Sequence, residues 1–86
     1  MTRLWPRGDP IEVLPGAGGA PQSFRWHGGW HQVAAIANRW RVQTNWWQPA
    51  EEVDRAYFKL TTADGLLCVL YTDLRDGAWY CARLYD

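Results

Sequence analysis

The sequence predicts an all-β domain, a small curled antiparallel sheet or barrel of five or six short strands with at most one helical turn. From Phe24 onward, apolar and aromatic residues come in short runs separated by turn signals, which is a β pattern. The chain has 86 residues and seven tryptophans. A domain of this length buries proportionally little surface, so these large rings, Trp26 and Trp79 among them, must supply much of its core.

Residues 1–21 differ in composition from the rest of the chain. They hold four of the five prolines and four of the eight glycines, including the run Pro15-Gly-Ala-Gly-Gly-Ala-Pro21. This composition favours an extended arm or flexible connector over regular packing. We therefore expect an arm over residues 1–21 and a β domain over residues 22–86, with a short edge strand at residues 11–14 as the alternative within the arm.

The first hairpin is expected around Gly28-Gly29, because glycines take the positive φ that a two-residue hairpin turn requires. Its strands cover residues 23–27 and 30–37. The segment that follows, residues 38–54, allows two interpretations. A loop or single helical turn over residues 49–54 is favoured, and the alternative is a long hairpin with Trp46 and Trp47 at its tip.

The C-terminal part predicts three consecutive antiparallel strands, at residues 56–62, 66–72 and 78–85. Ala63-Asp64-Gly65 joins the first two, and Asp-Gly is a favoured turn dipeptide. Residues 73–77 form the second connection. The middle strand is apolar on both faces, as expected for a central strand of a sheet that is covered on both sides.

Charge and cysteine content exclude several classes of protein. Nine basic and nine acidic residues cancel, which argues against a strongly basic DNA-binding protein.

Cys68 and Cys81, even with His27 and His31, lack the close Cys-x2-Cys spacing of a zinc site, so we expect buried free thiols and neither metal nor cofactor. Whether the two thiols face each other depends on strand register. Without a signal peptide or a run of about 20 apolar residues, the protein is expected to be cytoplasmic.

No catalytic constellation stands out, so we do not expect an enzyme. The glycine run at residues 16–19 lacks the lysine of a phosphate-binding loop, and Ser23, the only serine, lacks a Gly-x-Ser-x-Gly context. Cys81 lies in an aromatic strand, where a buried inert thiol is more common than a nucleophile. Glu51 and Glu52 are adjacent and point in different directions, unlike an acid–base pair.

Tryptophans beside arginines are the best candidates for contact with a partner. Trp40 lies between Arg39 and Arg41, and in a strand this places the ring on one face and both guanidinium groups on the other. Trp46 and Trp47 are adjacent, so on an extended chain only one of them points into the core. The outward indole either contacts a partner or packs against the sheet of its own domain.

Residues 24–86 have the order Phe24-Arg-Trp-x-Gly-x-Trp30, His31-x-Val33, Asn38-Arg-Trp40, Trp46-Trp47, Arg55-x-Tyr57-Phe58-x-Leu60, Leu70-Tyr71-x-Asp73 and Trp79-Tyr80 to Leu84-Tyr85-Asp86. This order resembles a small bacterial domain family and the tail of ImuB, the inactive Y-family polymerase-like subunit of the bacterial mutasome. It implies a partner-binding module in SOS-induced, error-prone translesion DNA synthesis, with a DNA polymerase or a RecA-like mutasome component as partner. The chain departs from that pattern because it contains no polymerase-like body and no β-clamp-binding peptide.

Two hypotheses about function follow. The first is a non-enzymatic protein-interaction module that uses strand addition and indoles in pockets; its candidate residues are Trp40, Trp46, Trp47, Arg55, Tyr57 and Phe58. The second is a single-stranded nucleic-acid-binding domain that uses base stacking and phosphate pairing; its candidate residues are Arg39, Arg41, Trp46, Trp47 and Arg55. No membrane partner is expected, and the sequence leaves the oligomeric state open.

Overall fold

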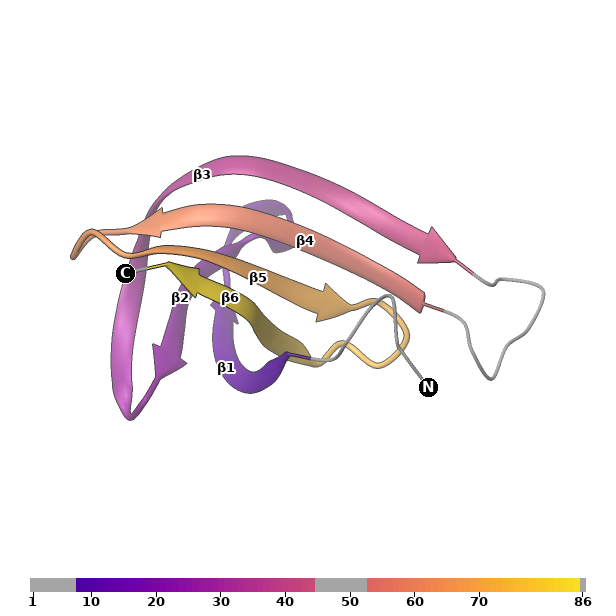
Figure 1. The fold of residues 1–86 in the computed structure, drawn as a ribbon, viewed down its shortest axis with the longest axis horizontal. Coiled ribbons are helices and arrows are strands. Elements are labelled where there is room, and N and C mark those ends of the chain that lie inside the picture. The colour runs from indigo at the N-terminus through magenta and orange to yellow at the C-terminus, as the bar shows by residue number, and fades with distance from the viewer. Residues whose placement is uncertain (1–7, 45–52, 86) are drawn as a thin grey trace.

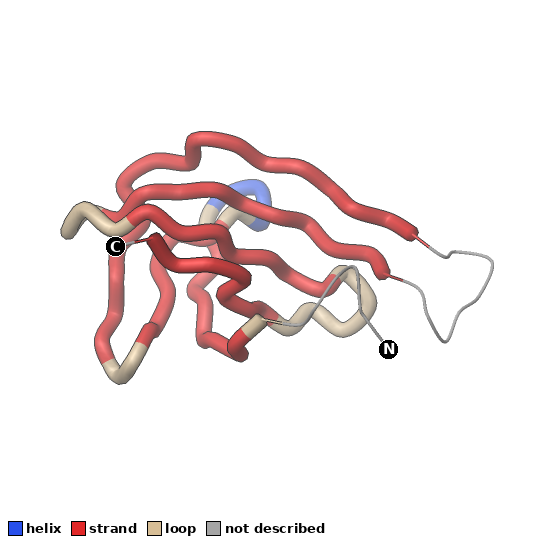
Figure 2. The backbone as a smooth tube through the Cα atoms, in the orientation of Figure 1, coloured by secondary structure: helices blue, strands red, loops and turns tan. Residues whose placement is uncertain are grey.

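The computed structural model describes residues 8–44 and 53–85 and contains six antiparallel strands with a single short helical turn (Figures 1 and 2). The strands are β1 (Asp9–Pro15), β2 (Pro21–Trp26), β3 (Gly29–Thr44), β4 (Val53–Thr62), β5 (Leu67–Asp73) and β6 (Trp79–Tyr85), and a 3-10 turn covers Ala17–Gly19. Each strand pairs with the next, and β6 pairs with β1, so the sheet closes into a barrel. The all-β class predicted from the sequence is confirmed. No helix of the described residues has the length and apolarity needed to cross a membrane.

The predicted hairpins are present, with one shift. The β2–β3 turn is centred on His27 and Gly28, whose φ angles are 51° and 82°, one residue earlier than the Gly28-Gly29 turn expected. A two-residue turn with positive φ at both positions matches the twist of the flanking strands. Gly29 is instead the first residue of β3 and pairs with Trp26. The β4–β5 hairpin and the C-terminal strand lie where the sequence predicted them.

The expected N-terminal arm is part of the barrel from Asp9 onward. β1 pairs with β2 on one side and with β6 on the other, so it is not an edge strand. Ile11 and Val13 pack against the core, which explains why a proline-bounded segment folds as a strand. The glycines that suggested flexibility form the tight 3-10 turn between β1 and β2. The expected boundary after residue 21 therefore does not separate an arm from a domain, because β2 itself begins at Pro21.

The last two residues of the helical turn expected over residues 49–54 are not helical. Val53 and Asp54 belong to β4 and pair with Thr44 and Gln43 of β3. β3 and β4 thus form the long hairpin that was the alternative interpretation, and Figure 1 shows the two strands extending together away from β1 and β2. Its tip, with Trp46 and Trp47, lies outside the described residues.

The core fills the interior of the barrel. Its buried members are Phe24, Phe58, Leu60, Cys68, Leu70 and Cys81. Trp26 and Trp79 are partly buried and pack against this cluster, in line with the core role expected of them. The β5–β6 register places both thiols on the interior face, but not directly opposite each other, because Cys68 is paired with Leu84 and Cys81 with Leu70.

β3 changes its neighbour partway along its length. It pairs with β2 as far as Gln32 and with β4 from Val33 to Thr44. Two register shifts, between Val33 and Ala35 and between Ile36 and Asn38, interrupt the pairing with β4. Such bulges bend a strand and increase its twist, and Figure 1 shows β3 curving through this region.

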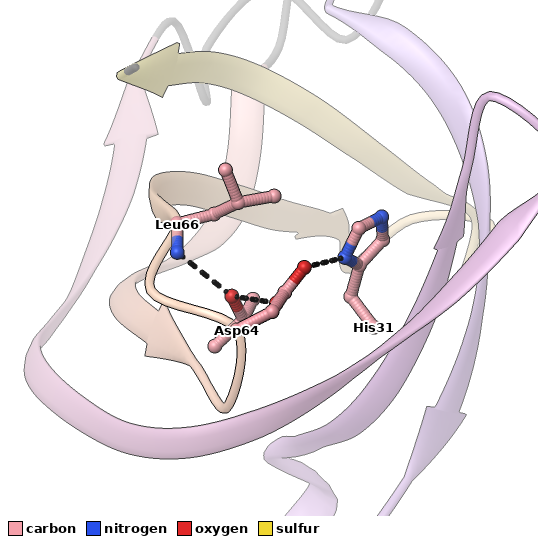
Figure 3. A network of polar contacts seen from close by, with 4 residues as sticks. His31, Asp64 and Leu66 are labelled. Carbon is pink, nitrogen blue, oxygen red and sulfur yellow. Dashed lines mark hydrogen bonds and ion pairs between the residues drawn. The ribbon is translucent and has the colours of Figure 1, made fainter.

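A polar network holds the corner at which β3 leaves β2 (Figure 3). The Nδ1 atom of His31 lies 3.0 Å from Oδ2 of Asp64, and the Thr62 hydroxyl donates to Oδ1 of the same carboxylate. The Leu66 N–H donates to the Thr62 hydroxyl at 2.9 Å. The hydrogen bond from Thr62, with a smaller contribution from His31, lowers the pKa of Asp64. The β4–β5 turn is thereby fastened to β3.

We expect Asp64→Asn to lower the melting temperature at neutral pH, because it removes the carboxylate at the centre of this network. The pKa of Asp64 is lowered in the folded state, so the carboxylate stabilises the fold above the ordinary pKa of about 3.9. That stabilisation is lost as pH falls through the lower folded-state pKa. Thermal melts followed by circular dichroism should therefore show a difference between wild type and Asp64→Asn that shrinks as pH falls below about 4. A difference that does not change with pH would contradict this role.

Candidate functional site

Four aromatic rings form a row across the outer face of β3, β4, β5 and β6. Trp40, Tyr57, Tyr71 and Tyr80 are directly opposite one another in successive strand pairs. The ring centroids of Trp40 and Tyr57 are 5.4 Å apart with an interplanar angle of 4°, and the next two pairs are each 5.0 Å apart. Cross-strand aromatic pairs at these separations stabilise a sheet beyond the area they bury. We refer to these four rings as the aromatic row.

The row is buried except at its β3 end. Tyr57, Tyr71 and Tyr80 are 8%, 1% and 7% exposed, whereas Trp40 is 40% exposed. Arg55 packs on the same face, with its guanidinium 4.5 Å from the centroid of Tyr71 and its Nη1 donating to the Tyr57 hydroxyl at 3.2 Å. A cation over an aromatic face is attracted by the ring quadrupole, the more so when water is excluded. The sheet is therefore packed on both faces, and β3 is anchored through Trp40.

Gly8 fixes the middle of the row from the N-terminal side. Its N–H donates to the Tyr71 hydroxyl at 3.0 Å. A Cβ atom at this position would overlap the carbonyl of Cys81, so only glycine permits the close approach. Burial raises the pKa of Tyr71, which keeps its hydroxyl protonated.

β3 has an open edge next to the exposed end of the row. Among the described residues, β3 pairs with β4 alone from Val33 to Thr44, and no strand lies on its other side. We call this side of residues 33–44 the free edge. An unpaired strand edge presents backbone N–H and C=O groups that are able to pair with another extended chain.

The hydrogen-bond pattern tells which backbone groups point outward. The Leu74 N–H donates to the Asp54 carbonyl, so the backbone of Asp54 is turned toward β5 and away from β3. In an antiparallel pair, residues alternate between facing the partner and facing away. Gln43 is opposite Asp54, so Gln43 and, at intervals of two, Arg41 and Arg39 direct their N–H and C=O groups to the free edge.

A side chain confirms this assignment. The Arg39 N–H donates to Oδ1 of Asn38 at 2.9 Å, and such a bond requires that this N–H is not engaged by β4. Asn38 therefore covers one outward donor of the free edge. Among the described contacts, no hydrogen bond is made by the outward backbone N–H and C=O groups of Arg41 and Gln43.

The side chains along the free edge alternate as the sequence predicted. Trp40 lies on the outer face, whereas Arg39 and Arg41 lie opposite Phe58 and Ala56 on the other face. The Arg39 guanidinium is 5.4 Å from the Phe58 ring centroid. Arg41 donates from Nε and Nη2 to the two carboxylate oxygens of Asp54, each at 2.9 Å, and this pairing raises the pKa of Arg41.

A shallow cleft lies where the free edge begins. It has a volume of about 310 Å³ and separates the bend of β3, residues 33–36, from the β1–β2 connection. Ile36, one of its lining residues, is 36% exposed although it is opposite Leu60 of the core. The cleft arises because β2 and β3 diverge at the bend. It adds a shallow hollow to one end of the free edge.

The structure brings together only part of the predicted site. Trp40 is at the free edge, Tyr57 stacks on it within the aromatic row, and Arg55 holds Tyr57 from beside the row. Phe58 is 4% exposed and belongs to the barrel core, so its contribution is to packing. Trp46 and Trp47 lie outside the described residues. Arg39 and Arg41 are exposed on the face away from the row.

Three residues of the site were not expected from the sequence. Tyr71 and Tyr80 complete the aromatic row, and Asn38 covers the Arg39 N–H. Tyrosines at Tyr57 and Tyr71 do stand at matching positions on either side of the Asp-Gly turn, which was a usable signal once that hairpin was assigned. Tyr80 could be added only with the β5–β6 register, which contains a shift between Val69 and Leu70.

The two thiols have the properties of core residues. Both are buried and free, and burial raises the pKa of Cys68 to about 12 and raises the pKa of Cys81 as well. A protonated thiol is a weak nucleophile and a weak metal ligand. Residues 8–44 and 53–85 contain no group of three or more side chains suited to hold a metal ion.

We expect neither thiol to react rapidly with a disulfide reagent such as DTNB in the native protein at about pH 8. Both should react once the chain is unfolded in urea, because the barrier is burial. Absorbance at the wavelength of the released thiolate follows the reaction, and Cys68→Ser and Cys81→Ser assign the signals. Fast labelling of one thiol under native conditions would point to an activated cysteine instead.

Trp40→Ala is expected to lower the free energy of unfolding by about 1 kcal/mol, because it removes one partly exposed stacking partner. Tyr57→Ala is expected to cost about 3 kcal/mol or more, because it empties the buried middle of the row. Urea unfolding of both variants measures the difference. Trp40→Phe, which keeps a ring, is the control and should lie close to wild type. A Trp40→Ala cost as large as that of Tyr57→Ala would mean that Trp40 is a core residue.

Comparison with known proteins gives a family but no characterised relative. No curated protein and no solved structure matches the chain. One family model matches residues 3–85, which is nearly the whole sequence and includes both the free edge and the aromatic row. The match begins before β1, in agreement with the place of β1 in the barrel. The chain belongs to the family described as a domain of unknown function, DUF6504.

Proposed function

We propose that this domain is a non-enzymatic protein-interaction module that binds an extended segment of a partner as an additional strand along the free edge of β3. The observation that carries the proposal is the free edge itself, on which Arg39, Arg41 and Gln43 direct their backbone groups outward. Strand addition uses these groups for affinity, while side chains at alternating positions determine specificity.

The free edge has only part of the usual protection against pairing. Edge strands are commonly protected by prolines, by charged side chains, especially lysines, or by bulges. β3 contains neither proline nor lysine, both of its bulges lie before Asn38, and its charged side chains are those of Arg39 and Arg41. Residues 38–44 are paired with β4 in regular register, so they offer seven residues of straight edge. The aromatic row holds this stretch in place before binding, which lowers the entropic cost of association.

The resemblance to the ImuB tail suggests where such a partner belongs. It favours a protein of SOS-linked translesion DNA synthesis in the cytoplasm, either a DNA polymerase or a RecA-like mutasome component. This part of the proposal rests on the resemblance alone.

Nucleic-acid binding is the second candidate, because Trp40 offers an exposed ring and two arginines flank it. The structure gives this candidate less support than the first. Both arginines lie on the face away from the Trp40 ring, and the formal net charge is zero. A single-stranded oligonucleotide that binds through phosphates would lose affinity steeply as salt rises, whereas a peptide in strand pairing would not.

A backbone substitution at the free edge tests strand addition. Gln43→Pro removes an outward N–H without touching the pairing with β4, and prolines are tolerated on strand edges for that reason. Gln43→Ala removes the same side chain and keeps the N–H. The ligands are peptides selected on the wild-type domain from a random displayed library. We expect these peptides to bind Gln43→Ala with wild-type affinity and Gln43→Pro at least about tenfold more weakly. That loss corresponds to about one hydrogen bond and the pairing geometry that it maintains.

The matched fold control is Val42→Pro, because the N–H of residue 42 faces β4. This variant should be clearly destabilised, because proline removes a ladder hydrogen bond to β4, while Gln43→Pro should unfold close to wild type. Equal peptide binding by Gln43→Pro and Gln43→Ala would rule out strand addition at this edge. Recovery of no peptide, together with salt-sensitive binding of a labelled single-stranded oligonucleotide, would favour the nucleic-acid candidate.

A further inference from the structure

We propose that the segment bound at the free edge carries an aromatic residue opposite Trp40, with an acidic residue on either side of it, opposite Arg39 and Arg41. This inference rests on the proposed strand addition and specifies the chemistry of the partner. It follows from the two different faces that the straight part of β3 presents.

The aromatic row supplies the first half of the argument. Three successive strand junctions each place one ring directly opposite the next, from Tyr80 to Trp40. The row stops at the free edge, where the Trp40 ring is stacked on Tyr57 on one side and remains 40% exposed. A strand added to β3 becomes the next strand of the same sheet. A ring opposite Trp40 would extend the row and cover the exposed indole.

The arginines supply the second half. In an antiparallel pair, opposite residues share a face of the sheet, so the residues next to the aromatic one would lie on the face of Arg39 and Arg41. Arg39 contacts the Phe58 ring and is paired with no carboxylate among the described residues. Arg41 uses two of its five N–H donors on Asp54. Both guanidinium groups can therefore donate hydrogen bonds to a carboxylate of an added strand. Opposite charges across a strand pair are stabilising.

The same charges disfavour a second copy of this chain as the occupant. If two β3 strands pair antiparallel about Arg41, this residue is opposite itself, and if they pair about Trp40, Arg39 is opposite Arg41. Like charges directly opposite one another destabilise a strand pair. In these two registers, like charges therefore disfavour pairing of the free edge with a second copy, whereas an acidic segment would complement both arginines.

The pattern defines a peptide. A partner strand antiparallel to β3 meets Gln43 first and Arg39 last, so its sequence runs polar, apolar, acidic, aromatic, acidic. The test peptide is end-blocked Thr-Val-Glu-Tyr-Glu-Thr. Three relatives isolate the contributions: one with Ala in place of Tyr, one with Lys in place of both Glu residues, and one with N-methylation of the backbone amides that would pair with β3.

Calorimetric titration of the full chain with each peptide measures the preference, and amide NMR shifts place the binding on β3. We expect both the Ala and the Lys peptide to bind about tenfold more weakly than the parent, which corresponds to about 1.4 kcal/mol. On the Trp40→Ala domain the parent and Ala peptides should bind alike. On the Arg39→Glu domain the Lys peptide should gain relative to the parent, a reversal that general loss of structure does not produce.

The outcomes separate this inference from the proposed function. If the parent, Ala and Lys peptides bind equally and only the N-methylated peptide fails, the inference is wrong and strand addition stands. If N-methylation has no effect on binding, strand addition itself is wrong. If none of the four peptides binds, the acidic and aromatic pattern is overturned, and the comparison of Gln43→Pro with Gln43→Ala decides strand addition independently.

Discussion

The structure depends on the bend in β3. A straight strand of sixteen residues would be ~50 Å long at about 3.3 Å per residue, whereas the longest extent of the molecule is 41 Å. β3 is therefore bent, and the two bulges between Val33 and Asn38 account for the turn. Before the bend β3 closes the barrel against β2, and after it β3 runs beside β4 alone. Barrel closure and the free edge are therefore two consequences of one strand that bends and changes its neighbour.

A strand with one neighbour needs stabilisation from elsewhere, and the two faces of the sheet provide it. Inside the barrel, Phe58 and Leu60 of β4 join the core. Outside, Tyr57 supports Trp40, and Arg55 fastens Tyr57 to Tyr71. β4 is thus packed on both sides at the positions that pair with the straight part of β3. This double packing explains how seven residues of edge are kept straight and available for pairing.

Side-chain alternation along β3 gives the free edge two chemical characters. The outer face ends in an aromatic ring, and the other face carries guanidinium groups. Neutral overall charge does not conflict with this local asymmetry, because Asp54 balances only Arg41.

The sequence by itself determined the all-β class, the C-terminal hairpins and the alternation of Trp40 with its flanking arginines, because turn dipeptides and a period of two are local properties. It did not determine that residues 9–15 close the barrel, since the proline and glycine content of residues 8–21 equally describes a linker and a strand followed by a tight turn. Nor did it determine the aromatic row. Tyr57, Tyr71 and Tyr80 meet only through the registers of two hairpins, one of which contains a bulge. The free edge was decided by tertiary structure alone, because an unpaired edge is the absence of a neighbour, and no residue of β3 encodes where β2 ends.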